Sequence, residues 1–162
     1  ILFGDSDDGA FVEYIPQLYT TDFSFEIWAL PSSVSLLQYL VSSLDTATNR
    51  GVDLYMGLDA IWVCEMGTGT GTVTVTANIE HIALVTTWSH IACIYDSAST
   101  TLTIYADGKP IQSASGTFVP NPTGNIQIAR NYNGGSHYAG LLDELAIFDY
   151  ALSEDQLRDH WA

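Results

Sequence analysis

Basic residues are nearly missing from this chain. Its 162 residues include four lysines and arginines against nineteen aspartates and glutamates, which gives a formal charge of −15 at pH 7. A nucleic-acid partner requires a basic groove, and this composition cannot form one. Anionic membrane surfaces repel such a chain as well. The acidic excess fits a solvated surface that prevents aggregation, cation binding, or adaptation to a saline environment, and charge alone does not separate these three explanations.

Long apolar runs are also missing. No stretch reaches about 18 uninterrupted apolar residues, so we expect no membrane insertion. An initiator methionine, a basic leader and a targeting signal are lacking too, which favours a processed chain or one domain of a larger parent polypeptide. The chain is nevertheless 47% hydrophobic and 12% aromatic, too apolar for a disordered segment. Residues 1–162 are therefore predicted to form a single domain.

Cysteine is scarce, with only Cys64 and Cys93 present, and both lie in strand-like runs. A disulfide between neighbouring strands and a pair of buried free thiols both fit this pattern. No Cys-x-x-Cys spacing or nearby histidine completes a ligand set, so we expect no metal site at these cysteines.

Strand-like runs and turn residues make up almost everything else. Glycine, asparagine and aspartate separate these runs, as is typical of a β-sandwich. The expected strands are Ala10–Ile15, Asp22–Leu30, Ser35–Ser43, Gly51–Leu58, Ala60–Met66, Thr72–Leu84, Trp88–Asp96, Leu102–Ala106, Pro110–Ser115, Asn125–Arg130 and Tyr138–Phe148. Ser153 and Gln156 match an N-cap and its capping-box partner, so Glu154–Trp161 is predicted to be a short C-terminal helix.

Three segments carry the most specific patterns. Phe23–Ala29 alternates aromatic and β-branched residues around Glu26 and Trp28. Trp88–Asp96 is followed by a second strand-like run that ends in Asp107-Gly108, a dipeptide that favours a tight hairpin turn. Near the C-terminus, a glycine precedes Leu-Leu-Asp-Glu-Leu-Ala-Ile-Phe, and Ala-Leu-Ser follows before the predicted helix.

In order and spacing, these segments resemble the laminin-G-like jelly roll of the concanavalin A-like lectin superfamily. They correspond to its "F-T-x-E-x-W" strand, its "W-x-H-v-A-x-x-Y-D … L-x-x-Y-x-D-G" pair and its closing "D-E" strand, and Leu2–Val12 is similar to the opening strand. The resemblance implies an all-β fold: two antiparallel sheets in a jelly-roll sandwich, with the first and last strands paired.

The resemblance also implies a structural calcium ion. The family commonly holds a cation between its opening loop and the aspartate of the "D-E" motif, and Ca²⁺ takes about six to eight oxygen ligands. By this resemblance the metal ligands are Asp5, Asp8 and Asp143. The alternative is that Asp143 caps a turn through backbone N–H groups while the acidic loop is merely solvated.

The carboxylates do not suggest an enzyme. Glucanases of this fold carry Glu-x-Asp-x-Glu, which aligns three acids on one strand face, whereas Asp143 and Glu144 are adjacent. Successive strand residues face opposite sides of a sheet, so we expect these two to serve different neighbours. Glu26 shares a strand face with Trp28, and a buried carboxylate needs a partner; Arg130 is the candidate for a structural pair.

Aromatic and amide residues in one loop suggest sugar binding. Sugars stack on aromatic rings while amides, carboxylates and histidines bond their hydroxyls. The glycan-binding candidates are Asn131, Tyr132, Asn133, His137 and Tyr138, with Tyr39, Tyr55 and Trp62 as a further platform if they line a concave sheet. The alternative is an ordinary glycine-rich loop with strand aromatics in the core. Trp28 and Trp88 are predicted to be core residues.

These observations predict a non-catalytic extracellular or surface-exposed module for recognition or adhesion. Its partner would be a glycan or a protein surface. The rival prediction is a structural or decoration subunit of a virion, filament or cell-surface assembly, which self-assembles. A lectin groups its exposed aromatics in a groove with polar groups, whereas a structural subunit spreads them over a flat, self-complementary patch.

Overall fold

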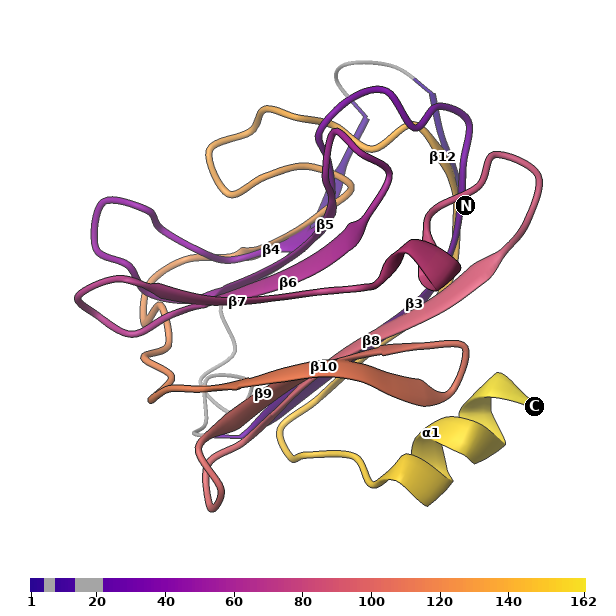
Figure 1. Cartoon of the computed structure of the whole chain (residues 1–162). Helices are drawn as coiled ribbons and strands as arrows, with labels where there is room; N and C mark the ends of the chain where they lie inside the picture. Colours follow the sequence, from indigo (N-terminus) through magenta and orange to yellow (C-terminus); the bar gives the residue numbers. More distant parts are fainter. Residues whose placement is uncertain (5–7, 14–21) are drawn as a thin grey trace.

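The protein is a sandwich of two antiparallel sheets, which confirms the predicted jelly roll (Figure 1). The computed structural model describes residues 1–4, 8–13 and 22–162. Sheet A contains, in spatial order, β1 (Leu2–Phe3), β12 (Gly140–Phe148), β3 (Phe23–Pro31), β8 (Ser89–Asp96), β9 (Thr101–Ala106) and β10 (Lys109–Ser115). Sheet B contains β2 (Ala10–Val12), β11 (Ile126–Ile128), β4 (Gln38–Ser42), β5 (Val52–Met56), β6 (Trp62–Gly67) and β7 (Thr72–Thr76).

The first and last strands of the sandwich lie side by side, as expected. Leu2 pairs with Leu141 and Phe3 with Gly140, and the Ile1 ammonium group donates a hydrogen bond to the Leu142 carbonyl oxygen at 2.7 Å. Pairing of the two ends closes one edge of sheet A and brings the N-terminal segment close to the final strand.

Alternation along the strands builds the core between the sheets. On β3, Phe23, Phe25 and Ile27 are buried between the layers. Facing residues from sheet B complete this core: Leu40, Val52, Leu54, Met56, Trp62, Cys64 and Met66. The period of two that predicted these strands is therefore the same feature that buries one side of each.

One predicted strand is too long. The segment Thr72–Leu84 was expected to be a single strand, but β7 ends at Thr76 and a 3₁₀ turn follows at Ile79–His81. The side chain of Asn78 caps this turn by accepting a hydrogen bond from the Glu80 amide at 3.2 Å. Asparagine competes for backbone donors in this way, which favours a turn over a continued strand.

The two cysteines form a disulfide. Cys64 lies in β6 and Cys93 in β8, so the bond joins the two facing sheets, not neighbouring strands of one sheet. Their Cα atoms are 6.0 Å apart and both residues are fully buried. The bridge therefore crosses the middle of the core.

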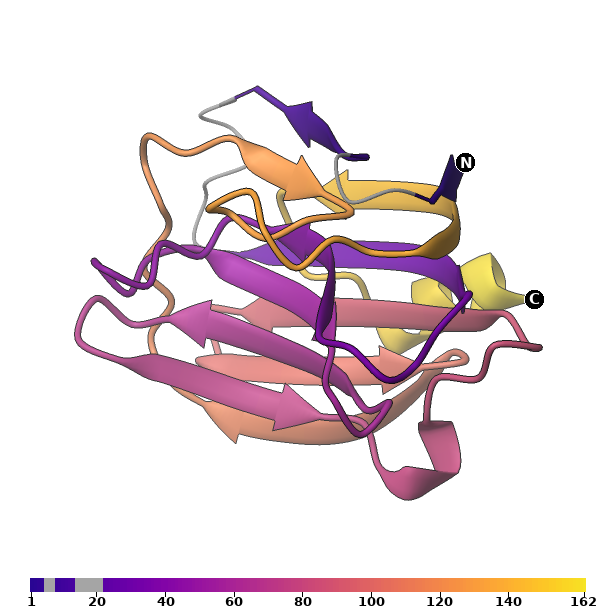
Figure 2. The ribbon, with the colours of Figure 1, turned by 90° about the horizontal axis from the view of Figure 1, so that it is seen from above.

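The C-terminal helix α1 (Glu154–Trp161) lies outside the sandwich, against sheet A (Figures 1 and 2). Its predicted capping box is present, with the Ser153 side chain and the Gln156 side chain each bonding the other's backbone amide. Leu157 is fully buried in a second apolar cluster with Ile94 and Tyr105 of sheet A. None of the helices in the described ranges is long and apolar enough to cross a membrane.

Candidate functional site

A bulge in β12 places two carboxylates on the same surface. Asp143 lies opposite Trp28 and Ala146 opposite Glu26, so the pairing with β3 shifts between Asp143 and Ala146. Glu144 takes a positive φ of 49°, an uncommon backbone conformation for this residue. The expectation that these two acids serve different neighbours is wrong, because the bulge breaks the strand alternation. Both are exposed and line one pocket.

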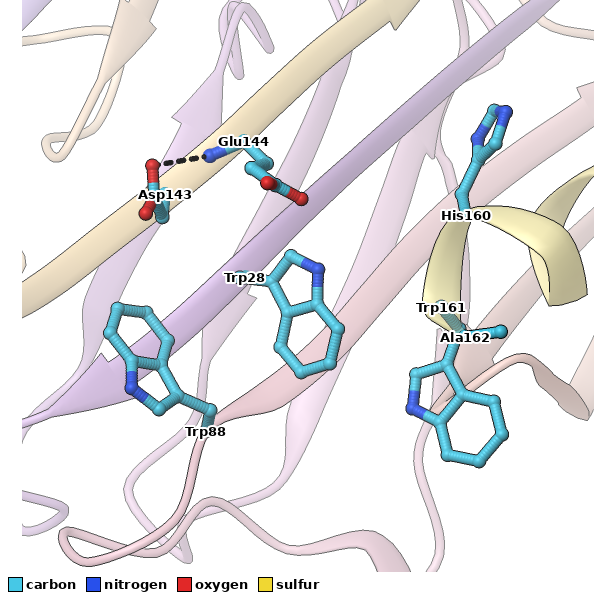
Figure 3. A pocket seen from close by; sticks show the side chains of 7 residues that line it. All are labelled: Trp28, Trp88, Asp143, Glu144, His160, Trp161 and Ala162. Carbon is cyan, nitrogen blue, oxygen red and sulfur yellow. Dashed lines mark hydrogen bonds between the residues drawn. The ribbon is translucent and has the colours of Figure 1, made fainter.

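That pocket lies on the outer face of sheet A. It has a volume of about 470 Å³, and we name it the tryptophan pocket after its three indoles (Figure 3). It is lined by Trp28, Trp88, Asp143, Glu144, His160, Trp161 and Ala162. The two acids come from β12 and Trp28 from β3, while α1 contributes the residues on the opposite side (Figure 3).

The prediction that Trp28 and Trp88 belong to the core is wrong. Trp28 alternates with the inward-facing Phe25 and Ile27 on β3, so it points to the outer face. Trp88 precedes β8 and is 38% exposed, and Trp161 at the end of α1 is 40% exposed. An aromatic, strand-like run does not show which face of the sheet packs against the second sheet. For this reason the sequence could not show that both tryptophans lie outside the core.

A second hollow of about 410 Å³ adjoins the tryptophan pocket and shares Trp28, Glu144 and His160 with it. Its floor contains Glu26, which is only 6% exposed. His160 Nδ1 lies 2.8 Å and 3.1 Å from the two carboxylate oxygens of Glu26. His90 Nε2 lies 3.6 Å from the same carboxylate. Burial raises the pKa of Glu26, but hydrogen bonds and charge interactions with both histidines outweigh it, so the pKa lies below the usual 4.5.

Glu26 therefore has a partner, but not the one expected. Arg130 follows β11 in sheet B, and its Nε donates to Gln127 Oε1 at 2.9 Å. The outer face of sheet A and the end of β11 are on different layers of the sandwich, which rules out the predicted Glu26–Arg130 pair. His160 comes from a helix 134 residues further along the chain, and no local pattern indicates this contact.

The predicted glycan-binding residues lie elsewhere, at sheet B. The Tyr132 amide donates to Ser42 Oγ at 2.7 Å, and Asn131 Oδ1 accepts from the Gly135 amide at 2.8 Å. Asn133 is exposed and His137 is partly exposed. Tyr138, in contrast, is fully buried in the main core.

Two of the platform residues do meet beside this loop. The rings of Tyr39 and Tyr55 stack with their centroids 5.0 Å apart, on the face of sheet B that points away from the core. The Tyr39 amide donates to the Ser136 carbonyl oxygen at 3.1 Å, which joins the loop to β4. Trp62 is fully buried and takes no part in this surface.

Beneath the loop is a buried acid that sequence reasoning missed. Asp53 is 4% exposed, and its Oδ1 accepts hydrogen bonds from Ser42 Oγ at 2.7 Å and from the Leu44 amide at 3.1 Å. Burial raises the pKa of Asp53 to about 7. The only sequence signal was one acidic residue within the run Gly51–Leu58, which does not distinguish a buried acid from a solvated one.

The residues predicted to bind calcium are only partly described. Asp5 lies outside the described residues. Asp8 Oδ2 accepts from the Gly4 amide at 2.8 Å, and Asp143 Oδ1 accepts from the Glu144 amide at 3.0 Å. Within the described ranges, no three His, Cys, Asp or Glu residues gather as a metal-binding group. The calcium ion therefore stays a prediction.

The two antiparallel six-stranded sheets define a jelly-roll sandwich. Residues 4–158 match the laminin G family of the concanavalin A-like lectin/glucanases superfamily, and the chain belongs to this family. The resemblance seen in the sequence motifs is thereby confirmed. A search of curated protein sequences finds no relative.

Several solved structures share the fold at low sequence identity. The CBM40 domain of the Ruminococcus gnavus IT-sialidase, bound to α2,3-sialyllactose, is 14% identical with a TM-score of 0.82, and the match covers 100% of this chain and 96% of that domain. A leech intramolecular trans-sialidase is 13% identical with a TM-score of 0.78 over 98% of this chain and 26% of that protein. A heptameric SAP-like pentraxin from Limulus polyphemus is 15% identical with a TM-score of 0.72, covering 99% and 80%.

Proposed function

We propose that this chain is a non-catalytic glycan-binding module and that its ligand binds in the tryptophan pocket. One observation carries the proposal: three partly exposed indoles from three separate segments surround one hollow, together with carboxylates and a histidine. Aromatic rings accept the apolar C–H faces of a sugar, while carboxylate oxygens and ring nitrogens bond its hydroxyls.

The comparisons support this function. The superfamily is named for lectins as well as glucanases, and the CBM40 domain with the same fold was solved with sialyllactose bound. A buried disulfide favours an oxidising compartment, in agreement with the proposed extracellular or surface location. Phe11 and Tyr150 are exposed outside the pocket, but the three tryptophans share one hollow with polar groups. This grouping favours recognition over the alternative of a structural subunit, for which a flat patch was expected.

A second surface is a competing glycan site on sheet B. There Tyr39 and Tyr55 stack beside the loop of Asn131 and Tyr132. Stacked, partly exposed tyrosines next to amide groups also fit a sugar ring. We rank this surface second because Tyr39, Tyr55 and Tyr132 line neither of the two hollows described above.

A glycan array followed by calorimetry tests the proposal. Substitution of Trp28→Ala or Trp88→Ala should weaken binding of the sugar that the array identifies by about tenfold or more, because each removes a stacking surface. Tyr132→Ala is the matched control and should leave the affinity unchanged. Loss of binding only in Tyr132→Ala would move the site to sheet B. A silent array with ordered multimers on size-exclusion chromatography would contradict the proposal and favour the structural subunit.

A further inference from the structure

The charges around the tryptophan pocket are of one sign. Asp143 and Glu144 are exposed on its wall, and Glu26 lies in the adjoining hollow. Neither hollow has a lysine or arginine among its lining residues. Residues 5–7 and 14–21, outside the described ranges, contain no lysine, arginine or histidine either. The charged residues that line the pocket are therefore carboxylates, and the residues outside the described ranges supply no basic side chain.

The basic residues of the chain lie at other places. They are Arg50, Lys109, Arg130 and Arg158. Arg158 is on α1 but pairs with Asp155 at 3.1 Å. Lys109 is the first residue of β10. The preceding residue, Gly108, lies against Trp161: a Cβ atom added at Gly108 would be 3.4 Å from the Trp161 side chain. Neither Lys109 nor Arg158 lines the pocket.

The histidines do not neutralise the two pocket acids. His160 Nδ1 and His90 Nε2 both point at the Glu26 carboxylate, at 2.8 Å and 3.6 Å. In the part of the chain that the structure describes, no cationic group lies within ion-pair distance of Asp143 or Glu144. Among the described residues, these two exposed carboxylates therefore have no ion-pair partner.

Tryptophan adds to the same preference. The face of an indole attracts an organic cation through its quadrupole, and tryptophan is the strongest of the aromatic side chains in this respect. Trp28, Trp88 and Trp161 line the hollow together with Asp143 and Glu144, and Trp28 lies between the other two indoles (Figure 3). Indole faces and unpaired carboxylates together favour a ligand that carries both an apolar ring face and a positive charge.

Building on the proposed function, we infer that the glycan bound here carries a free amino group, as in oligosaccharides of deacetylated amino sugars. The sugar ring stacks on an indole while its ammonium group bonds Asp143 and Glu144. An anionic sugar is excluded because its carboxylate would meet two like charges. The inferred ligand therefore differs from the sialyllactose bound to the CBM40 domain.

Calorimetric titration with three oligosaccharides tests this inference. At about pH 6 the amino group of a glucosamine oligomer is protonated. We expect this oligomer to bind about tenfold or more tightly than its fully N-acetylated counterpart of the same length, and sialyllactose not to bind. Affinity for the amino form should also fall as salt rises, since exposed charges are screened.

Charge-neutral variants locate the effect. D143N/E144Q should abolish the preference for the amino form, so that this variant binds the amino and N-acetylated oligomers with equal affinity. D59N/E154Q, which removes the same charge from exposed positions that do not line the pocket, should keep the preference.

The outcomes separate the inference from the proposed function. Equal affinity for the amino and N-acetylated oligomers, with Trp28→Ala weakening both, overturns the inference and leaves glycan binding intact. Sialyllactose binding overturns it as well. Absence of binding to every glycan of an array overturns both. Choline binding as tightly as the amino oligomer and lost in Trp28→Ala overturns the assignment to a sugar.

Discussion

Asp53 is a buried acid with a strongly raised pKa, although the sequence around it does not distinguish it from a solvated aspartate. Its carboxyl group is buried on sheet B and hydrogen-bonded by Ser42 Oγ, which in turn accepts from the Tyr132 amide. One buried acid thus supports the loop that carries the second candidate surface. Desolvation disfavours its charged form, which is why its pKa rises.

Asp53 should make the protein more stable in mild acid than at neutral pH. Its pKa is about 7 in the folded state against 3.8 for the ordinary side chain, so between about pH 4 and pH 7 the folded state binds more protons than the unfolded state. The free energy of unfolding should therefore fall as pH rises through this window, by up to about 4 kcal/mol, and level off above it. Urea unfolding at several values from about pH 5 to pH 8 measures this slope.

Asp53→Asn should flatten the slope, because a neutral amide replaces the titrating group. Asp59→Asn is the matched control: Asp59 is exposed on a turn of the same sheet, and the variant should keep the wild-type slope. Glu26 does not disturb this window, since its lowered pKa places its own effect below about pH 4.5. An unchanged slope in Asp53→Asn would show that another group titrates.

Local patterns predicted which residues face the core more reliably than they predicted partners. The Phe25 and Ile27 alternation and the Asp107-Gly108 turn, where both residues take positive φ, are confirmed because they depend on neighbours in sequence. The Glu26–His160 contact depends on where α1 docks, which no local pattern contains. The positive φ at Glu144 could not be predicted either, since glutamate has no preference for that conformation.

At the scale of elements, the disulfide between β6 and β8 is the one side-chain cross-link between the facing sheets in the described part of the chain. It closes a segment with a sequence separation of 29. By loop-closure entropy such a cross-link stabilises by about 3–4 kcal/mol. Because it lies in the middle of the core, its loss should loosen the contact of both sheets together.

Reduction should therefore lower the stability of the whole domain. We expect a reductant to decrease the free energy of unfolding in urea by about 3–4 kcal/mol. The double variant Cys64→Ala/Cys93→Ala should start at the lower value and show no further response to reductant. If the wild-type protein unfolds at the same urea concentration with and without reductant, the bridge does not stabilise the fold.

Helix α1 matters because it carries one wall of the tryptophan pocket. Its Leu157 is fully buried against sheet A, whereas Trp161 and His160 of the same helix line the pocket. Docking of the helix thus positions groups on the binding surface. The sequence predicted the helix and its N-cap. The apolar face of the helix, however, could not indicate which sheet the helix would cover.

Leu157→Ala should weaken glycan binding without touching the pocket itself. The variant loses buried apolar contacts, at a cost of about 2–5 kcal/mol, and the loosened helix no longer holds Trp161 in place. Asp155→Ala, on the exposed side of α1, is the control and should bind sugar normally. Calorimetry and urea unfolding are measured together. A destabilised Leu157→Ala with unchanged affinity would exclude α1 from the binding site.

At the scale of the whole molecule, the sandwich has two outer faces of different character. On sheet A, α1 covers part of the face and leaves the acidic tryptophan pocket beside it. On sheet B, the loop of Tyr132 lies beside Tyr39 and Tyr55. Pairing of β1 with β12 adds a third feature, because it places Leu2 and Phe3 beside the strand that carries Asp143.

The calcium prediction is tested on the intact domain. If a cation joins Asp8 and Asp143, it binds only where the first and last strands are paired, so it stabilises by RT ln(1 + [L]/Kd), about 2.7 kcal/mol at a hundredfold excess over Kd. Addition of EDTA should then lower the melting temperature by several degrees, and excess calcium should restore it. Asp143→Asn should melt at the lower temperature and ignore EDTA, while Asp59→Asn should respond like the wild type. If EDTA leaves the melting curve unchanged, the calcium prediction is wrong. Asp8 and Asp143 would then act as acceptors for the Gly4 and Glu144 amides and not as metal ligands.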